Sequence, residues 1–295
     1  MDKAEIVESF QSLQDDICNG LEALDGQGTF HQDAWERPGG GGGRTRIIQG
    51  KHIEKGGVNF SAVHGKMPEN IAANLGIGDN NFFATGVSIV LHPINPHVPI
   101  IHMNVRYFET DNGHWWFGGG IDLTPHLIVD DLAISFHSAL KAVCDKHHDD
   151  YYLKYKKWAD DYFFVRHRNE TRGIGGIFFD RLGKEGGNKQ AHFDFVIDVG
   201  QAFLPIYSEQ FSTNFEKQYS EREKRWQLHR RGRYVEFNLV WDRGTKFGLE
   251  TGGNIESILM SLPPNVSWTY RFEPNEQEKD TLAKLRKGID WATLS

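Results

Sequence analysis

A short stretch near the middle of the chain alternates hydrogen-bonding and apolar side chains. His102, Asn104 and Arg106 occupy every second position, with apolar residues between them. In a β-strand these three side chains share one face, and burying that face in a dry core would cost much free energy. The alternative is a face exposed to solvent, but the neighbouring sequence is apolar and aromatic. The pattern therefore favours a ligand pocket.

Other residues could complete such a pocket. Ser88 and His92 share a face of the preceding apolar stretch, which could adjoin the first face if the two strands pair. Arg106 and Arg243 lie beside apolar segments and could bind a carboxylate through paired donors. Asp242 precedes a turn, where its carboxylate could bind or deprotonate an N–H group; a simple turn cap is the alternative.

The fourteen histidines raise the question of a metal site. The sequence has no HExxH pattern. His137 and His167 fall within expected helices, where a histidine satisfied by core contacts is the commoner explanation. A metal site built from His92 and His102 with these helical histidines is the weaker hypothesis.

The elements that must position these residues follow from hydrophobic periodicity. Apolar residues at helical spacing predict a helix over the first 25 residues, ending near Gly26. Further helices are expected over residues 130–147, 149–167, 190–217 and 275–287. Strands are expected over residues 85–92, 100–108, 174–179, 233–242 and 267–272. This order is no regular βαβ alternation, so we expect an α+β fold: one domain, residues 1–295, whose mostly antiparallel sheet is covered by helices.

Residues 27–43 are polar and end in five glycines, so we expect a flexible segment. The sequence argues against a phosphate loop, because Arg44-Thr45-Arg46 follows the glycines instead of Gly-Lys-Ser/Thr. A plain linker and a lid that brings Arg44 and Arg46 to a carboxylate both remain open.

Composition limits the possible functions. The formal net charge is −7 and no long basic run occurs, which argues against nucleic-acid binding. Two distant cysteines provide neither a disulfide framework nor a thiolate metal site, and no apolar stretch has the length of a membrane span. Met1 to Phe10 resembles neither a signal peptide nor a transit sequence. We expect a cytoplasmic protein.

Ten segments, in order from about Gly39 to about Tyr270, resemble the oxygen-dependent coproporphyrinogen III oxidase family. They are residues 40–44 (GGGGR), 57–61 (GVNFS), 102–109 (HMNVRYFE), 115–125 (WWFGGGIDLTP), 155–158 (YKKW), 167–170 (HRNE), 172–180 (RGIGGIFFD), 230–239 (RRGRYVEFNL), 242–249 (DRGTKFGL) and 256–263 (ESILMSLP). Such a match is specific because long motifs recur in one order.

The resemblance implies a homodimer in which each subunit has a flat, largely antiparallel seven-stranded sheet sandwiched between helices. It also implies oxidative decarboxylation of two propionates of coproporphyrinogen III to vinyl groups in haem biosynthesis, giving protoporphyrinogen IX. Molecular oxygen is the co-substrate, and no organic cofactor is implied. The dimer contacts are expected in the regions from Val58 to Met67 and from Tyr234 to Tyr270.

The resemblance also implies roles for individual residues. His102 matches the proposed proton donor, and Asp242 and Arg243 match a pair that addresses pyrrole N–H groups and a propionate. Substrate contacts are implied for Ser88, Asn104, Val105, Arg106, Asp122, Gly252, Gly253 and Asn254. The family usually has arginine at the last of these positions, so Arg44, Arg46 or Arg243 would take over its carboxylate contact. We expect no metal to be required, although His92, His102, His137 and His167 match histidines once proposed as metal ligands.

Two rival hypotheses remain. A histidine-ligated metal oxygenase would lose activity on chelation. A non-catalytic tetrapyrrole-binding protein would release no carbon dioxide in air.

Overall fold

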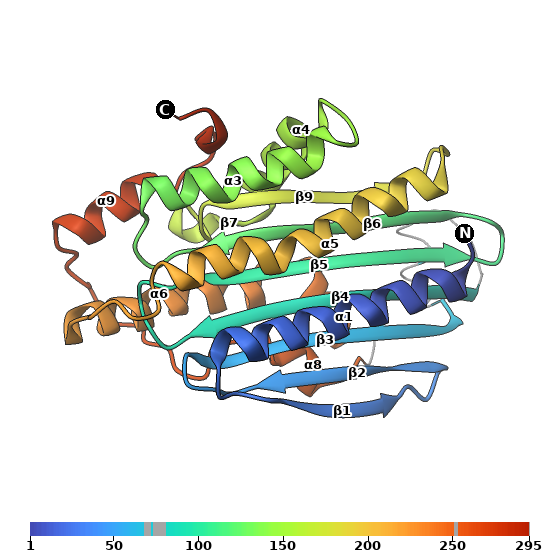
Figure 1. The fold of residues 1–295 in the computed structure, drawn as a ribbon, viewed down its shortest axis with the longest axis horizontal. Coiled ribbons are helices and arrows are strands. Elements are labelled where there is room, and N and C mark those ends of the chain that lie inside the picture. Colours follow the sequence, from blue (N-terminus) through green and yellow to red (C-terminus); the bar gives the residue numbers. More distant parts are fainter. Residues whose placement is uncertain (68–71, 73–80, 251–252, 295) are drawn as a thin grey trace.

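A computed structural model describes residues 1–67, 72, 81–250 and 253–294 of the chain. Its centre is a seven-stranded sheet in the order β1-β2-β3-β4-β5-β6-β9, in which every neighbouring pair is antiparallel (Figure 1). The strands are β1 Phe30–Glu36, β2 Gly41–Ile48, β3 Ile53–Lys66, β4 Asn81–Pro93, β5 Ile100–Thr110, β6 Trp115–Thr124 and β9 Gly175–Leu182. The expected α+β class with a helix-covered antiparallel sheet is confirmed.

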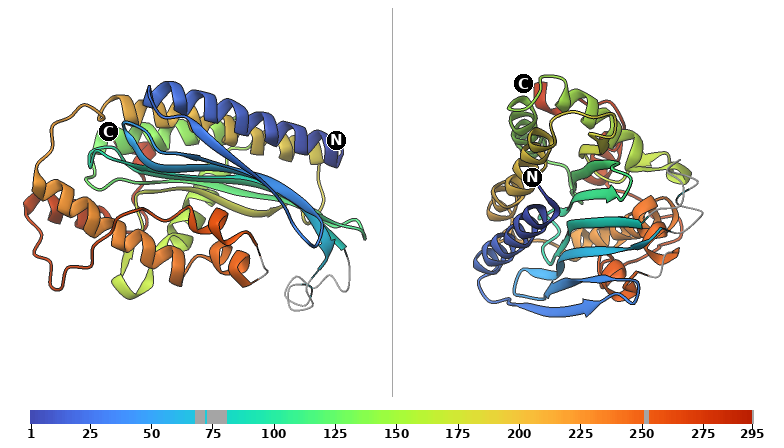
Figure 2. Two further views of the ribbon diagram at one scale, coloured as in Figure 1. Left: turned by 90° about the horizontal axis from the view of Figure 1, so that it is seen from below. Right: turned by 90° about the vertical axis from the view of Figure 1, so that its right-hand side faces the viewer.

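Helices cover both faces of the sheet. They are α1 Lys3–Asp25, α3 Asp130–Asp145, α4 Tyr151–Tyr162, α5 Lys189–Ser212, α6 Glu221–Val240, α7 Arg243–Glu250, α8 Ile255–Leu259 and α9 Glu276–Lys284. Figure 2 shows α1, α3 and α5 on one face and α6 to α8 on the other. Two short strands, β7 Phe164–Val165 and β8 Glu170–Thr171, flank a single 3₁₀ turn, η1 Arg166–Arg168. A second 3₁₀ turn, η2 Trp291–Thr293, lies near the C-terminus. None of the helices in the described ranges is long and apolar enough to cross a membrane.

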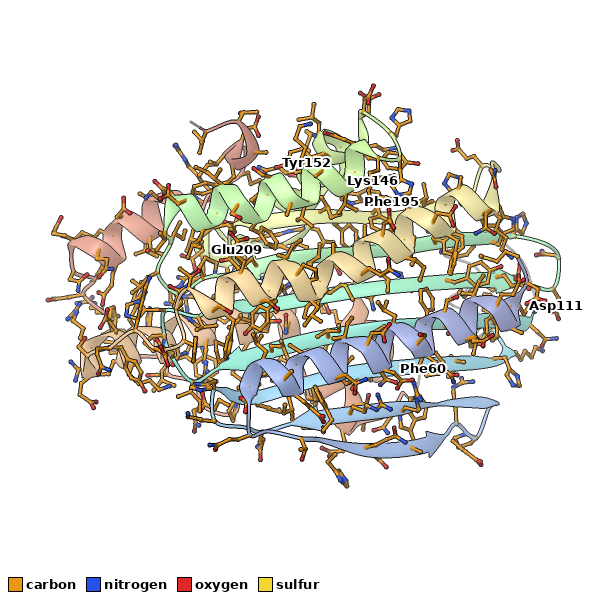
Figure 3. The ribbon with its side chains drawn as sticks, viewed as in Figure 1. Phe60, Asp111, Lys146, Tyr152, Phe195 and Glu209 are labelled. Carbon is orange, nitrogen blue, oxygen red and sulfur yellow. The ribbon has the colours of Figure 1, made fainter. Side chains whose placement is uncertain are left out.

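The sheet has one apolar face, and this face forms the main core. Alternate residues of β4 and β5 point toward α1 and α5 and are fully buried, among them Val87, Ile89 and Met103. Phe195 of α5 packs against Phe179 of β9 with ring centroids 5.0 Å apart. Figure 3 shows Phe195 on this side of the sheet. Burial of these side chains supplies the main driving force for assembling the layers.

The opposite face carries the polar alternation and is only partly covered. The segment around α8 lies on it near β2 and β3: the Ser257 carbonyl accepts a hydrogen bond from Asn59 at 3.0 Å. A Cβ on Gly57 would collide with Met260, so this glycine permits close packing of that segment on the sheet. The polar face is therefore the boundary with a second helical layer.

The predicted flexible segment 27–43 instead forms most of the edge hairpin. Residues 30–36 form β1, and the last three glycines begin β2. The turn between them has positive φ at Gly40 and Gly41, a backbone conformation that glycine adopts without strain. Arg44 and Arg46 point toward α1, where both contact Asp15. The structure therefore supports neither a linker nor a lid that presents these two arginines to a ligand.

The strand expected over residues 233–242 is wrong. Residues 233–240 belong to α6, which begins with a capping box formed by Ser220 and Glu223. Arg230 and Arg231 are buried at 3% and 0% exposure and pair with Glu170 and Glu54. The strand was expected because apolar Val235, Phe237, Leu239 and Trp241 occupy every second position.

Other boundaries differ less. The helices over 130–147, 190–217 and 275–287 and the strands over 85–92, 100–108 and 174–179 are confirmed within a few residues at most ends. The helix expected over 149–167 ends at Tyr162, and residues 267–272 form no strand. Four strands of the sheet, β1, β2, β3 and β6, were not anticipated. In β2, β3 and β6, glycines interrupt the apolar alternation.

One carboxylate joins the end of α1 to the turn between β2 and β3. The side chain of Asp25 accepts hydrogen bonds from the backbone N–H groups of Gly28, Lys51, His52 and Ile53, all at 2.8 Å. Burial raises the pKa of Asp25, but these four donors outweigh burial and leave the pKa below its usual value.

Asp25→Asn should destabilise the fold by about 3 kcal/mol, because the amide nitrogen turns two of these N–H groups into unpaired buried donors. Because the folded-state pKa is lowered, the contribution of Asp25 is present above its unfolded-state pKa and is lost as pH falls through the folded-state value. Urea unfolding at pH 7 and at pH 3 measures both effects. Asp16→Asn, at an exposed position of α1, is the control and should change the free energy of unfolding by less than about 0.5 kcal/mol. Equal stability of both variants would contradict this role.

Candidate active site

The polar face of β5 carries the three residues that the sequence singled out. His102, Asn104 and Arg106 pair across the sheet with Val90, Ser88 and Gly86 of β4. Cross-strand partners lie on the same face, so the expected neighbourhood of Ser88 with β5 is confirmed. All three β5 side chains are half-buried. They are held in place by the sheet yet remain accessible to a ligand.

His102 contacts a buried carboxylate. Its Nδ1 lies 2.8 Å from Oδ1 of Asp122, the residue directly opposite on β6. Both oxygens of Asp122 also accept hydrogen bonds from the guanidinium of Arg172, at 2.7 and 2.8 Å. The same guanidinium donates to Oδ1 of Asn238 on α6 at 2.8 Å. A continuous polar chain therefore runs from β5 through β6 to the covering helix.

Arg172 is enclosed by aromatic rings. Its guanidinium carbon lies 4.4 Å, 4.8 Å and 4.7 Å from the ring centres of Phe163, Tyr234 and Phe237, within the range of cation–π attraction. Burial alone would raise the pKa of Asp122, but the charge of Arg172 and the hydrogen bond from His102 lower it below its usual value. Asp122 is therefore a carboxylate at neutral pH.

This arrangement selects a tautomer of His102. An ionised Asp122 only accepts hydrogen bonds, so Nδ1 of His102 must carry the proton in that contact. In the neutral ring Nε2 then has a free lone pair and can accept a proton; in the imidazolium form Nε2 can donate one. The buried carboxylate thus orients His102 for proton transfer at Nε2.

Arg106 is held by two acceptors. One terminal nitrogen donates to Oδ1 of Asn104 at 2.8 Å, and the other donates to Oδ1 of Asp180 on β9 at 2.9 Å. The Arg106 side chain is 37% exposed. A guanidinium has five N–H groups, so further donors remain on an accessible cation beside His102.

Asp242 caps the start of α7. It accepts the hydroxyl of Tyr162 at 2.6 Å, and both the backbone N–H and the hydroxyl of Thr245, at 2.8 and 2.7 Å. Although burial raises the pKa of Asp242, these hydrogen bonds lower it below its usual value. A weakly basic carboxylate with one lone pair left can accept another N–H donor, but it is a poor base. The structure thus favours binding over deprotonation, and the expected turn cap is also present.

Asp242 lies close to the β5 residues through the end of α4. Tyr162, its hydrogen-bond partner, stacks on Phe178 of β9 with ring centroids 4.2 Å apart. The next residue, Phe163, contacts the ring of His102 edge-on at 5.9 Å. The structure therefore brings His102, Arg106 and Asp242 to one region of the polar face.

The four histidines proposed as metal ligands do not converge. The two ring nitrogens of His137 contact Tyr152 and Ile174, and those of His167 contact Glu236 and Trp241. These contacts occupy the lone pairs that a metal would need. Burial lowers the pKa of His92 to about 3, and its Nε2 donates to the Ser261 carbonyl at 2.8 Å. Within the described ranges, no three His, Cys, Asp or Glu side chains are grouped to hold a metal ion.

The other residues that were expected to contact the substrate lie in different surroundings. Val105 is fully buried in the core on the opposite face of β5, so its side chain cannot contact a ligand beside Arg106. Arg243 is exposed and lies over the ring of Tyr162 at 5.0 Å. Asn254 caps α8, and Gly253 donates to the Gly248 carbonyl. Gly252 lies outside the described residues.

Sequence reasoning missed three residues of this site. Arg172 and Asp180 begin and end the segment RGIGGIFFD, but only their partners on β5 and β6 had been assigned roles. Tyr162 sits at the end of a helix and gave no signal of its own. A surface cavity of about 620 Å³ lies elsewhere, lined by His52, Ile94, Asn95, Phe215, Glu216, Lys217, Gln218 and Tyr219. The candidate site is therefore an accessible sheet face and is separate from that cavity.

Comparison with known proteins identifies the family of the chain. The chain belongs to the coproporphyrinogen III oxidase family, whose sequence model matches residues 5–291. A curated relative from Prochlorococcus marinus (strain NATL1A) is 46% identical over 309 residues, which covers 95% of this chain and 88% of the relative. That protein is named oxygen-dependent coproporphyrinogen-III oxidase. The resemblance in the sequence motifs is thereby confirmed.

Nitrogen-15 NMR of labelled histidine should show neutral His102 with its proton on Nδ1, because Asp122 accepts it. Asp122→Asn should remove this preference. His137 is the matched control: its Nε2 faces the Ile174 carbonyl at 3.0 Å, so its tautomer should not change. A dominant Nε2–H form of His102 in the unaltered protein would contradict the assignment.

Proposed function

We propose that this protein converts two propionate side chains of coproporphyrinogen III into vinyl groups with molecular oxygen, giving protoporphyrinogen IX. For each propionate, oxygen accepts two electrons and two protons, while carbon dioxide and a vinyl group are formed; the atoms balance with hydrogen peroxide as the reduced product. The family membership and the named relative support this activity. The accessible cluster of His102, Arg106 and Asp242 supports the location.

Arg106 binds the reacting propionate in this proposal. Its guanidinium is a permanent cation that matches a carboxylate in geometry and charge. Ser88 and Asn104 lie directly opposite each other on β4 and β5 and supply further hydrogen-bonding groups beside it. Local cationic groups are needed because the chain as a whole carries a formal charge of −7, which disfavours a tetra-anionic ligand.

Asp242 makes the pyrrole easier to oxidise. The substrate carries N–H donors, and the carboxylate stays ionised because Tyr162 and Thr245 donate to it. A fixed negative charge beside the pyrrole N–H groups stabilises the positive charge that develops as oxygen removes electrons from the ring. Asp242 thereby acts as a hydrogen-bond acceptor and an electrostatic stabiliser.

His102 manages the proton of the breaking C–H bond. Loss of one β-hydrogen and of carbon dioxide from the propionate leaves the vinyl group. Neutral His102 can accept this proton at Nε2 because Asp122 holds Nδ1–H. The imidazolium can return a proton to reduced oxygen, which agrees with the proton-donor role expected from the resemblance. Chain residues therefore bind, orient and move protons, and we propose that no organic cofactor or metal is needed.

In air the purified protein should release carbon dioxide and form vinyl groups from coproporphyrinogen III, and both should stop under anaerobic conditions. Arg106→Ala should lower kcat/KM by at least about tenfold, because a charge-assisted contact to the propionate is lost. Arg225→Ala, at an exposed arginine of α6, is the control. Carbon dioxide release and porphyrin fluorescence measure the effects. Turnover without oxygen, or an unchanged rate in the Arg106 variant, would contradict the proposal.

The homodimer is part of the proposal. Large apolar side chains in the region from Tyr234 to Tyr270 are exposed, among them Leu239, Ile255 and Tyr270. Such a group of exposed apolar residues is typical of an interaction surface, and it supports this region as one of the two expected contacts. The region from Val58 to Met67 remains the second.

Sedimentation should therefore give twice the mass of one chain. The double variant Ile255→Lys and Tyr270→Lys should weaken the dimer by at least about tenfold, because charges would enter an apolar contact. Leu153→Lys on α4, a residue 62% exposed and outside both regions, should leave the dimer intact. A monomeric unaltered chain would refute the assignment.

A cytoplasmic location completes the proposal. Cys18 and Cys144 are both free and buried, and burial raises the pKa of each thiol, to about 11 and about 12. Free thiols suit a reducing compartment.

A further inference from the structure

The guanidinium of Arg106 lies over the neighbouring strand, in the place where a residue other than glycine would carry its side chain. Arg106 pairs with Gly118 across β5 and β6. A Cβ on Gly118 would lie 2.7 Å from Nε of Arg106 and 2.8 Å from its guanidinium carbon. Gly118 does not have a positive φ, so its backbone would accept alanine. Glycine at this position leaves the space that the guanidinium occupies.

Asp180 lies beyond Gly118 as seen from Arg106. It belongs to β9, the strand beyond β6, and its Oδ1 accepts from Arg106 at 2.9 Å. The Arg106 side chain thus crosses a whole strand over Gly118 to reach it. Asn104 holds the other terminal nitrogen at 2.8 Å. The two acceptors, Asn104 and Asp180, and the missing side chain of Gly118 together determine where the guanidinium lies.

Stability does not account for this arrangement. The Asp180 and Arg106 side chains are 32% and 37% exposed, and ion pairs at such exposure add little to stability. A free arginine side chain loses much rotamer entropy when a ligand immobilises it. A guanidinium already fixed by Asp180 binds a carboxylate without that loss.

We infer that Asp180 and Gly118 are positioning residues: together they fix the guanidinium of Arg106 on the sheet so that its remaining N–H groups meet the substrate propionate. This inference rests on the proposed function, because the propionate is the ligand of Arg106 there. Asp180 acts through Arg106 and does not contact the reacting atoms.

A double-mutant cycle tests the coupling. Asp180→Ala should lower kcat/KM for coproporphyrinogen III about tenfold, mainly through KM, since the orientation of the carboxylate-binding group is lost. Gly118→Ala should act in the same direction by lifting the guanidinium off β6. In the Arg106→Ala background each change should alter kcat/KM less than about twofold. Asp180→Asn keeps an acceptor and should recover part of the loss.

The matched control is Asp198→Ala. Asp198 lies on α5, is 29% exposed and pairs with His147 and Lys146, so it has similar exposure without contact with the site. Its kcat/KM should stay within about twofold of the unaltered protein. If Asp180→Ala has no effect, or costs the same with and without Arg106, the inference is overturned.

A second readout needs no turnover. Arginine-selective nitrogen-15 relaxation in the substrate-free protein should show an ordered Arg106 Nε–H that becomes mobile in Asp180→Ala and in Gly118→Ala. An inactive unaltered protein would refute the proposed function alone. Unchanged order of Arg106 in both variants would refute the positioning role and leave the proposed function standing.

Discussion

The ion pair between Asp122 and Arg172 links the sheet to the helices over its polar face, and the site depends on it. Both side chains are almost fully buried, at 1% and 3% exposure. A pair this deep adds little net stability, because desolvation opposes the attraction, yet removing one partner leaves an unpaired buried charge. Its consequence is geometric. Asp122 fixes the tautomer of His102, while Asn238 and the rings around Arg172 fix the position of α6.

The two faces of the sheet divide the tasks. One face is apolar and packs on α1 and α5, which makes the strands rigid. The other face can then carry polar and charged groups, because groups that remain accessible to solvent avoid the cost of burial in an apolar core. Gly57 and Gly118 have no side chain that projects from this face. The segment around α8 can therefore pack on Gly57, and the side chain of Arg106 can cross β6 over Gly118. Rigidity and open space on the same sheet position a cation, an imidazole and a carboxylate, which we propose bind one ligand.

The sequence predicted those parts of the fold that depend on apolar periodicity alone. The first helix, the strands around Val87 and Met103 and their shared polar face follow from spacing. Glycines concealed β2, β3 and β6, because a residue without a side chain carries no hydrophobic signal. Val235, Phe237, Leu239 and Trp241 occupy every second position and imitated a strand, although Leu239 is exposed in the helix. The pairs of Arg230 and Arg231 with Glu170 and Glu54 join residues far apart in sequence and left no local signal. Long-range pairs also explain the missed roles of Arg172 and Asp180.

A crystal structure with coproporphyrin III, the oxidised and unreactive form of the substrate, tests the central claim most directly. The account predicts that the macrocycle lies on the polar face, with one propionate bound by Arg106, its β-carbon near Nε2 of His102, and the pyrrole N–H groups facing Asp242. A macrocycle bound on another surface, such as the cavity beside His52 and Phe215, or one whose propionates leave Arg106 uncontacted, would contradict the account.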